Sequence, residues 1–131
     1  MKDDILSKVP NGDRAQELWL QHAAGFIYFR DIREYAISKI DRKVKSKERR
    51  NIIRGIDDAV YGLMMMLDGV VGNLDNKSKR IEIETKISLR DKVKDTIIKE
   101  LNVLNGDGMC MGYHYWKDGN FGDNHPVKRK A

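Results

Sequence analysis

Hydrophobic residues recur every three or four positions over two long stretches of the chain, which predicts two amphipathic helices. The first stretch runs from Asp13 to about Ile40, and the second runs from Ser46 to about Val70. Because the first helix would be long for so small a protein, we expect a bend or break in it at Gly25. Asp13 and Ser46 are candidate N-caps, since their side chains accept hydrogen bonds from first-turn amides.

The segment 50–73 is the most apolar part of the chain and suits a central, buried helix. Glycines recur within it at seven-residue intervals, at Gly55, Gly62 and Gly69. Small residues on one side of a helix let a second backbone approach closely, so we predict tight packing through this glycine face. Gly69 is alternatively the end of the helix, where Asp68 and Gly69 turn the chain.

Strict alternation of apolar and polar residues from Ile81 to Leu89 predicts a half-buried strand. A lone strand leaves its backbone groups without partners. Three arrangements stay open. The partner strand comes from a segment around residues 113–116, or residues 80–89 pair with the same strand of a second subunit in a homodimer, or the segment is an extended lid over the helices.

Residues 88–91 resemble a helix capping box with Asp91 in place of Glu, and apolar residues follow at helical spacing. A third helix is therefore predicted from about Leu89 to Leu104, stopped by Asn105 and Gly106. The segment 107–122 is rich in glycine and aromatic residues and is either an ordered loop or a short amphipathic helix. The apolar face of that helix would consist of Met109, Met111, Tyr113 and Trp116.

These patterns predict a mainly α fold, a small helical bundle of three to four helices with one extended strand or short hairpin. Residues 1–122 would form a single helical domain, and residues 123–131 a disordered basic tail. The 131 residues are 40% hydrophobic and 34% charged, a balance typical of soluble globular proteins. No apolar run is long enough to span a membrane. A single cysteine, Cys110, excludes an intrachain disulfide, so a cytoplasmic location is expected.

The net charge of +5 is concentrated in one segment. Residues 39–54 contain eight basic and two acidic side chains, a net charge of +6, so the remainder of the chain sums to −1. Clustered Lys and Arg are the electrostatic footprint of phosphate binding, although they also occur at solvated corners between helices. The candidate partner-binding residues are Arg42, Lys43, Lys45, Lys47, Arg49 and Arg50.

Cys110 and His114 are the best candidates for metal ligands, because they are four residues apart and would share one face of a helix. His125 follows further on, but no second pair of cysteines accompanies them. The simpler interpretation is a small buried thiol and a partly exposed histidine. The same cysteine, with His114 or His22 as a base, lacks the surroundings that activate a nucleophile. We assign no catalytic residue and no cofactor.

Three carboxylates, Asp57, Asp58 and Asp68, lie in or beside the most apolar helix. An acid among apolar neighbours has a raised pKa and suits acid–base chemistry. More often such a residue caps a neighbouring helix or pairs with a nearby arginine. The sequence does not decide between a functional and a structural role for these three residues.

Two pieces of the chain, IDDAVYGLMMMLDGVVG and YHYWKDGNFG, resemble a group of small bacterial proteins of unassigned function. Some of these proteins sit beside toxin genes as presumed immunity proteins. The resemblance implies a mostly helical, cytoplasmic, non-enzymatic binding protein. This chain departs from the pattern in one respect, because immunity proteins against nucleases tend to be acidic and this chain is basic. No functional residue is carried over from the resemblance.

Three functions are therefore compared. The leading hypothesis is a non-enzymatic protein-binding module, a regulatory or immunity-type protein whose partner is another protein. The first alternative is a nucleic-acid-associated factor that uses the basic segment 39–54. The second alternative is a small metal-dependent enzyme.

Overall fold

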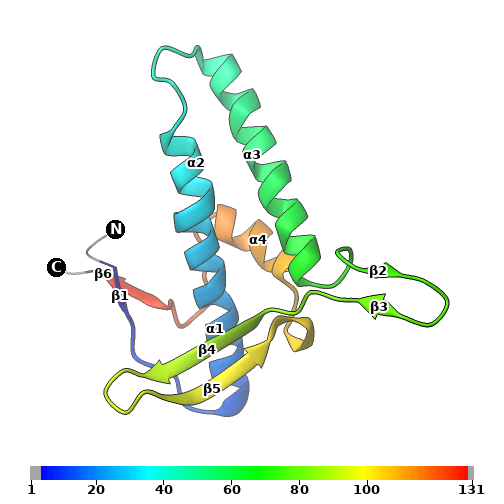
Figure 1. Ribbon diagram of the computed structural model, residues 1–131. Coiled ribbons are helices and arrows are strands. Elements are labelled where there is room, and N and C mark those ends of the chain that lie inside the picture. The colour runs from blue at the N-terminus through cyan, green and yellow to red at the C-terminus, as the bar shows by residue number, and fades with distance from the viewer. Residues whose placement is uncertain (1–3, 130–131) are drawn as a thin grey trace.

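Two long helical rods lie side by side and form a hairpin that rises from the rest of the protein (Figure 1). The structure is a computed structural model, and it describes residues 4–129. The first rod consists of α1 (Asp13–Tyr28), a π-helical segment (Phe29–Glu34) and α2 (Tyr35–Ser38), and the second rod is α3 (Ser46–Leu67). Both predicted helical stretches are confirmed, and the two rods run antiparallel.

The first rod does not break at Gly25, contrary to the prediction. Its irregularity is the π-helical segment, which carries the chain from α1 into α2 without leaving the helical backbone conformation. Gly25 instead lies against the indole ring of Trp116, to which an added Cβ atom would approach within 2.4 Å. Neither Asp13 nor Ser46 forms the predicted side-chain cap, because each is already the first residue of its helix.

The predicted third helix, from Leu89 to Leu104, is wrong, because this stretch forms most of a β-hairpin. β4 (Lys86–Asp91) pairs antiparallel with β5 (Thr96–Asn102), in a register that places Ile87 opposite Leu101. The apolar residues of this stretch happen to fit a helical period, but the chain reverses direction between two strands.

The turn of this hairpin explains the apparent capping box. The Asp91 carboxylate accepts hydrogen bonds from the backbone N–H groups of Val93 and Lys94, at 2.9 and 3.0 Å, and so closes a turn instead of capping a helix. Asp95 follows with a φ of 52°, in the left-handed region that a tight turn requires. Val93, which the prediction placed on a buried helix face, is 95% exposed at the tip of the turn.

The alternating segment that was predicted as one strand is divided in two. β2 (Leu74–Asp75) pairs antiparallel with β3 (Arg80–Ile81), and residues 82–85 separate β3 from β4. β4 finds its partner in β5. The segment 113–116 is helical, so it does not supply the partner strand.

The predicted C-terminal tail contributes a strand. β6 (Val127–Arg129) pairs antiparallel with β1 (Asp4–Leu6), and the Ser7 N–H group donates a 2.8 Å hydrogen bond to the Pro126 carbonyl. Pro126 is also buried, so packing and pairing together order this part of the segment 123–131. Residues 130 and 131 lie outside the described residues.

Within residues 4–129, three two-stranded antiparallel sheets accompany the helices. The protein therefore has an α+β fold, and the prediction of a mainly α, all-helical bundle is wrong. The physical reason is that two hairpins form within the segment 74–102, where a helix was predicted for the later part. A third strand pair joins segments near the two ends of the chain and uses residues that were predicted to be a tail.

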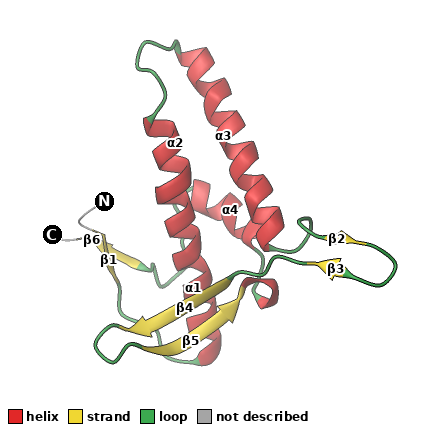
Figure 2. Ribbon diagram, viewed as in Figure 1, coloured by secondary structure: helices red, strands yellow, loops and turns green. Residues whose placement is uncertain are grey.

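The core lies where α4 (Met109–Lys117) crosses the lower part of the helical hairpin (Figure 2). The described helices α1, α3 and α4 supply most of its buried side chains, and two residues outside them complete it. These core residues are Ala24, Val60, Met64, Leu67, Val103, Met109, Tyr113, Trp116 and Phe121. A smaller cluster joins α1 to the β4–β5 hairpin through Trp19, Leu20, Leu89 and Leu101.

The segment 107–122 thus contains a helix, one of its two predicted forms, but Met111 is exposed rather than part of the buried face. The glycine face of α3 is not a packing surface. An added Cβ atom at Gly55 or Gly62 would meet no atom within 4 Å, because α3 turns a different side to the core. Gly69 does end the helix, with a φ of 75° directly after the last helical turn. Among the described residues, no helix is both long and apolar enough to cross a membrane.

Candidate functional site

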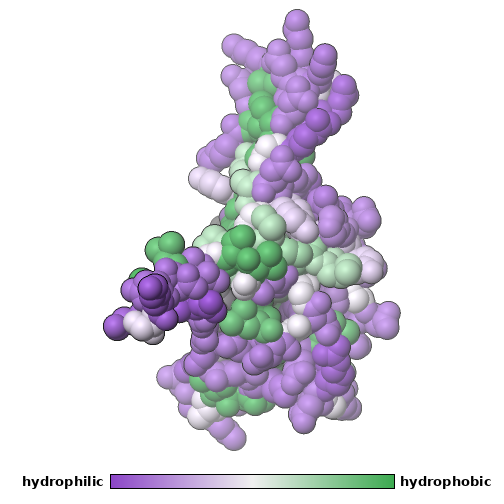
Figure 3. Space-filling view, turned by 90° about the vertical axis from the view of Figure 1, so that its right-hand side faces the viewer, coloured by the Kyte–Doolittle hydropathy of each residue, from purple (hydrophilic) through white to green (hydrophobic). Residues whose placement is uncertain are grey.

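The six predicted partner-binding residues come together at one end of the helical hairpin, which we call the basic tip, residues 39–54. Three of them lie in the loop between α2 and α3, and three lie in the first turn and a half of α3. All six side chains are exposed, and none forms an ion pair within residues 4–129. These residues are Arg42, Lys43, Lys45, Lys47, Arg49 and Arg50. Figure 3 shows mostly hydrophilic residues at this upper end of the molecule, with a strip of hydrophobic residues between them.

The charge of the basic tip is poorly compensated within the protein. The Asp41 carboxylate accepts a 2.9 Å hydrogen bond from the Lys43 backbone N–H, so it stabilises the loop. Glu48 is the one acidic residue in the first turn of α3. The unpaired amides at the start of a helix carry a partial positive charge, and they add to the positive potential of the neighbouring side chains. The tip is therefore a concentrated cationic surface on a projecting element.

A charged cluster below the tip ties the two rods to α4. The Arg33 Nε donates to Asp57 Oδ1 at 2.7 Å, and the Tyr113 hydroxyl donates to the same oxygen at 2.5 Å. The Arg33 guanidinium also lies over the Phe29 ring, 4.7 Å from its centroid. Three elements thus meet at one carboxylate, and the orientation of the helical hairpin is set there.

Burial of the Asp57 carboxyl raises its pKa, but hydrogen bonds from Arg33 and Tyr113 outweigh this effect and hold the pKa below its usual value of 3.8. Burial and the Asp57 charge raise the pKa of Tyr113 well above its ordinary value of 10.0. The carboxylate is ionised and the phenol is protonated, which is the pairing that favours the hydrogen bond. The sequence analysis considered two structural roles for such an acid, a helix cap and an arginine pair. In the structure, Asp57 pairs with an arginine.

Asp57 was singled out by the sequence, but Arg33 was not, and Tyr113 was expected only as part of the apolar face of a short helix. Arg33 lies in the π-helical segment, and π-helical turns frequently lie at functional sites. The one sequence signal for this contact was an acidic residue in an apolar helix. It predicts an arginine partner but does not indicate which arginine. Asp58, the next residue along α3, is exposed.

Asp68 has the other role considered for these acids, since it caps a neighbouring helix. Its carboxylate accepts hydrogen bonds from the backbone N–H groups of Met109 and Cys110, at 2.6 and 2.9 Å, at the start of α4. The end of α3 therefore positions the beginning of α4. This contact spans 41 residues of sequence and could not be read from local spacing.

Cys110 and His114 lie one turn apart on α4, as the spacing predicted. Within residues 4–129, no group of three or more His, Cys, Asp or Glu side chains is arranged to hold a metal ion. His125 instead packs against the rings of Phe26 and Phe121. Burial and the neighbouring Asp68 raise the pKa of the Cys110 thiol, and a raised pKa lowers the thiolate fraction that a nucleophile needs.

His22, the other histidine considered as a base, is part of the core contacts. The Trp116 Nε1–H group donates to His22 Nδ1 at 2.9 Å, so this ring nitrogen is an acceptor and the neutral tautomer carries its proton on Nε2. Burial lowers the pKa of His22. The histidine and the indole thereby connect α1 with α4.

A second projecting element, which we call the arm, comprises residues 74–84 (Figure 1). Leu74 lies opposite Ile81 in the pairing of β2 with β3, so both side chains are on one face of the arm. They are 73% and 66% exposed, and Ile83, two residues further along the same face, is 56% exposed. The other face carries charged residues, and Arg80 forms ion pairs there with Asp75 at 3.0 Å and Glu82 at 3.6 Å.

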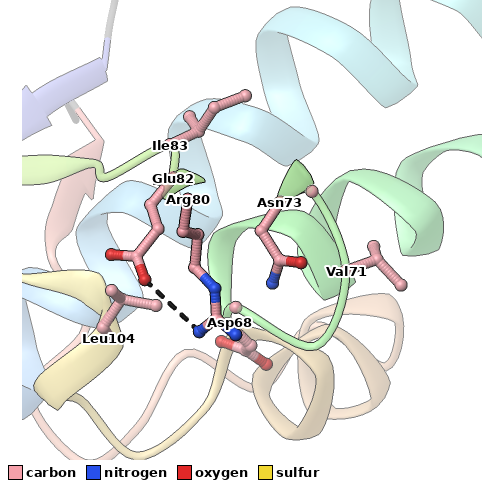
Figure 4. Close-up of a pocket in the computed structure, with 9 residues that line it drawn as sticks. Asp68, Val71, Asn73, Arg80, Glu82, Ile83 and Leu104 are labelled. Atoms are coloured by element: carbon pink, nitrogen blue, oxygen red, sulfur yellow. Dashed lines mark ion pairs between the residues drawn. The ribbon is translucent and has the colours of Figure 1, made fainter. Parts of the chain in front are cut away.

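A cavity of about 180 Å³ lies between the base of the arm and the end of α3 (Figure 4). Figure 4 shows the Arg80 and Glu82 side chains directed toward Asp68 and Leu104, whereas Ile83 projects to the other side. The charged face of the arm is therefore turned toward the body of the protein at this point. In Figure 3, hydrophobic residues gather at mid-height on the side from which the arm projects.

Comparison of the chain with protein-family models, with curated proteins and with solved structures gave no match.

Proposed function

We propose that this protein is a protein-binding module that docks an acidic surface of another protein through the basic tip. The observation that carries the proposal is the net charge of +6 in residues 39–54, presented on a helical hairpin that projects beyond the core. Complementary charges across an interface speed association and select the partner. The likeness to presumed immunity proteins supports a binding role, and the basic charge calls for an acidic partner.

A protein partner fits the tip better than a nucleic acid. Residues 39–54 contain no aromatic side chain on which a base could stack, and stacking accompanies basic residues in many single-strand binding sites. The basic side chains also surround a convex loop rather than lining a groove that follows a phosphate backbone. A convex, cationic hairpin end suits insertion into an acidic cleft of a partner.

The rigid support of the tip favours specific docking. The Asp57 cluster holds the first rod against α3 and α4, and the loop between α2 and α3 is closed by hydrogen bonds from Lys43 N–H to the Asp41 side chain and from Val44 N–H to the Asp41 carbonyl. Interfaces that are ordered before binding lose less conformational entropy. The charged side chains therefore have a defined frame, even though each is individually exposed.

Photo-crosslinking tests the proposal. A photoreactive amino acid replaces Lys45 in the tip, and Lys92, an exposed lysine in the turn between β4 and β5, is the matched control position. In cells that naturally express the chain, we expect a discrete adduct from position 45 that is sensitive to protease, contains an acidic protein, and disappears when Arg49→Glu and Arg50→Glu are added.

The same experiment separates the competing functions. An adduct from position 45 that nuclease destroys would favour the nucleic-acid-associated function. Equal adducts from positions 45 and 92, or an adduct that survives the charge reversal, would show that the tip is not a specific docking surface.

A further inference from the structure

We propose that the arm pairs with the arm of a second copy of this chain, through antiparallel pairing of residues 80–84 across a twofold axis. The observation behind this proposal is an extended, exposed segment in which residues 82–84 have no backbone hydrogen-bond partner among the described residues, and whose side chains can pair with the same side chains of a second copy. The proposal concerns a different surface from the basic tip and does not depend on the function proposed for it.

The backbone of the arm has an open edge. Within residues 4–129, the backbone groups of Glu82, Ile83 and Glu84 form no hydrogen bond to another backbone group. Pairing resumes at Thr85, whose carbonyl accepts from the Val103 N–H at 3.0 Å. Unpaired backbone groups along an extended segment are a template for another strand.

The arm is also incomplete as a sheet. β2 and β3 contribute only two residue pairs, and an isolated two-stranded hairpin is marginally stable in water. Pairing of residues 80–84 with their equivalents would join two hairpins into one four-stranded sheet. The apolar face of that sheet would combine Leu74, Ile81 and Ile83 of one copy with the same three residues of the other.

The charges of the segment and its open backbone edge together favour one register. When Glu82 lies opposite Glu82 of the second copy, Arg80 faces Glu84 twice and Ile81 faces Ile83 twice. Opposite charges and apolar pairs on facing strand positions are stabilising. The single unfavourable contact is between the two Glu82 side chains, and each of these already lies 3.6 Å from its own Arg80.

The neighbouring registers are less favourable. With Ile83 opposite Ile83, Arg80 faces Lys86 and Glu82 faces Glu84, so like charges meet at four positions. With Ile81 opposite Ile81, Ile83 and Glu84 face residues 79 and 78 of the turn and leave the open backbone edge largely unpaired. The segment is thus complementary to itself at one register.

Cysteine crosslinking tests this register. Antiparallel partners have Cα atoms about 4.5–5.5 Å apart, which a disulfide spans, whereas two equivalent residues at position 84 would be about 14 Å apart. In a Cys110→Ser background, we expect Glu82→Cys to form a disulfide-linked dimer much faster than Glu84→Cys at equal protein concentration. Equal rates, or no crosslink at either position, would overturn the proposed pairing.

Sedimentation of the unmodified chain provides the second measurement. We expect a concentration-dependent dimer, and we expect Ile81→Lys with Ile83→Lys to remove it while the monomer still unfolds cooperatively. Val93→Lys, at an exposed apolar position in the other hairpin, is the matched control and should leave the dimer intact. A wild-type chain that stays monomeric at every concentration, or a dimer that persists in the double variant, contradicts the proposal.

Discussion

Gly25 of α1 lies so close to the indole ring of Trp116 that an added Cβ atom would be 2.4 Å from it. No real Cβ atom sits at this distance from a ring, so the contact requires glycine. The sequence suggested that Gly25 weakens a helix, and the structure shows that it makes room for the largest side chain of α4. The helix has the glycine for packing reasons.

The first prediction concerns this contact. Gly25→Ala should lower the free energy of unfolding by about 1–3 kcal/mol, the usual cost of overpacking a filled core. Gly55→Ala is the matched control, because its Cβ would meet nothing within 4 Å and alanine should stabilise the helix by about 0.5–1 kcal/mol. Urea denaturation of both variants measures the two effects, and similar changes in both would contradict the structure.

The second prediction concerns Asp57 and acid stability. Because the pKa of Asp57 is lower in the folded protein than the ordinary value of 3.8, the folded state binds this proton less readily than the unfolded chain. The stability that the carboxylate provides is therefore present above about pH 4 and is lost as the pH falls through its folded pKa. Asp57→Asn should be less stable at neutral pH and lose less stability on acidification.

Asp58→Asn is the control for this measurement, since Asp58 is the adjacent, exposed acid on the same helix. Its free energy of unfolding at neutral pH should stay close to the wild-type value, because the side chain is exposed. If the free energy of unfolding of Asp57→Asn fell between pH 5 and pH 2 as steeply as that of the wild type, the cluster with Arg33 and Tyr113 would not contribute to the pH dependence of stability.

The third prediction concerns His22, whose pKa burial lowers from the ordinary value of 6.5. The folded state resists protonation of this ring, so the unfolded chain binds more protons below pH 6.5. Stability is then complete above this pH and falls as the pH drops toward the folded pKa. His22→Asn keeps an acceptor for the Trp116 N–H but does not titrate, so it should lack this decline in thermal unfolding between pH 7 and pH 5.

The fourth prediction concerns the cap that Asp68 provides for α4. Asp68→Ala should cost about 0.5–2 kcal/mol, as for other helix caps, and Asp68→Asn should cost less because it keeps one acceptor oxygen. Since Asp68 also raises the pKa of the Cys110 thiol, both variants should react faster with an alkylating agent at a fixed pH near 8. An unchanged alkylation rate would show that Asp68 does not influence the pKa of the Cys110 thiol.

The helical part of the fold could be predicted because its information is local. Apolar residues at intervals of three and four located both rods, including the start of α3 at Ser46 and the turn at Gly69 that follows its last residue, Leu67. The hairpin between β4 and β5 was missed because Val93 and Leu101 happen to fit a helical period. Its turn uses Asp91 and Asp95 rather than an Asn-Gly or Asp-Gly pair, which is the strongest local sequence signal of a hairpin.

The contacts that position the site could not be predicted, because they join distant parts of the chain. Asp57 and Asp68 were recognised as candidates, but their partners, Arg33 and Met109, lie 24 and 41 residues away in the sequence. The residues next to each acid do not indicate these partners. The basic tip was predicted from composition alone, since charge clustering needs no tertiary information. Its projection from the core depends on the hairpin geometry.

The pairing of β1 with β6 determines how the protein would respond to a pulling force. Asp4 lies opposite Arg129 and Leu6 opposite Val127, so tension applied at residues 4 and 129 would open the strand pair one residue at a time rather than shear it as a unit. β1 is further fastened to the first rod by the 3.4 Å ion pair between Asp4 and Arg30. The β1–β6 strand pair would therefore open first under a small force. The helical core would bear tension only after the two strands had separated.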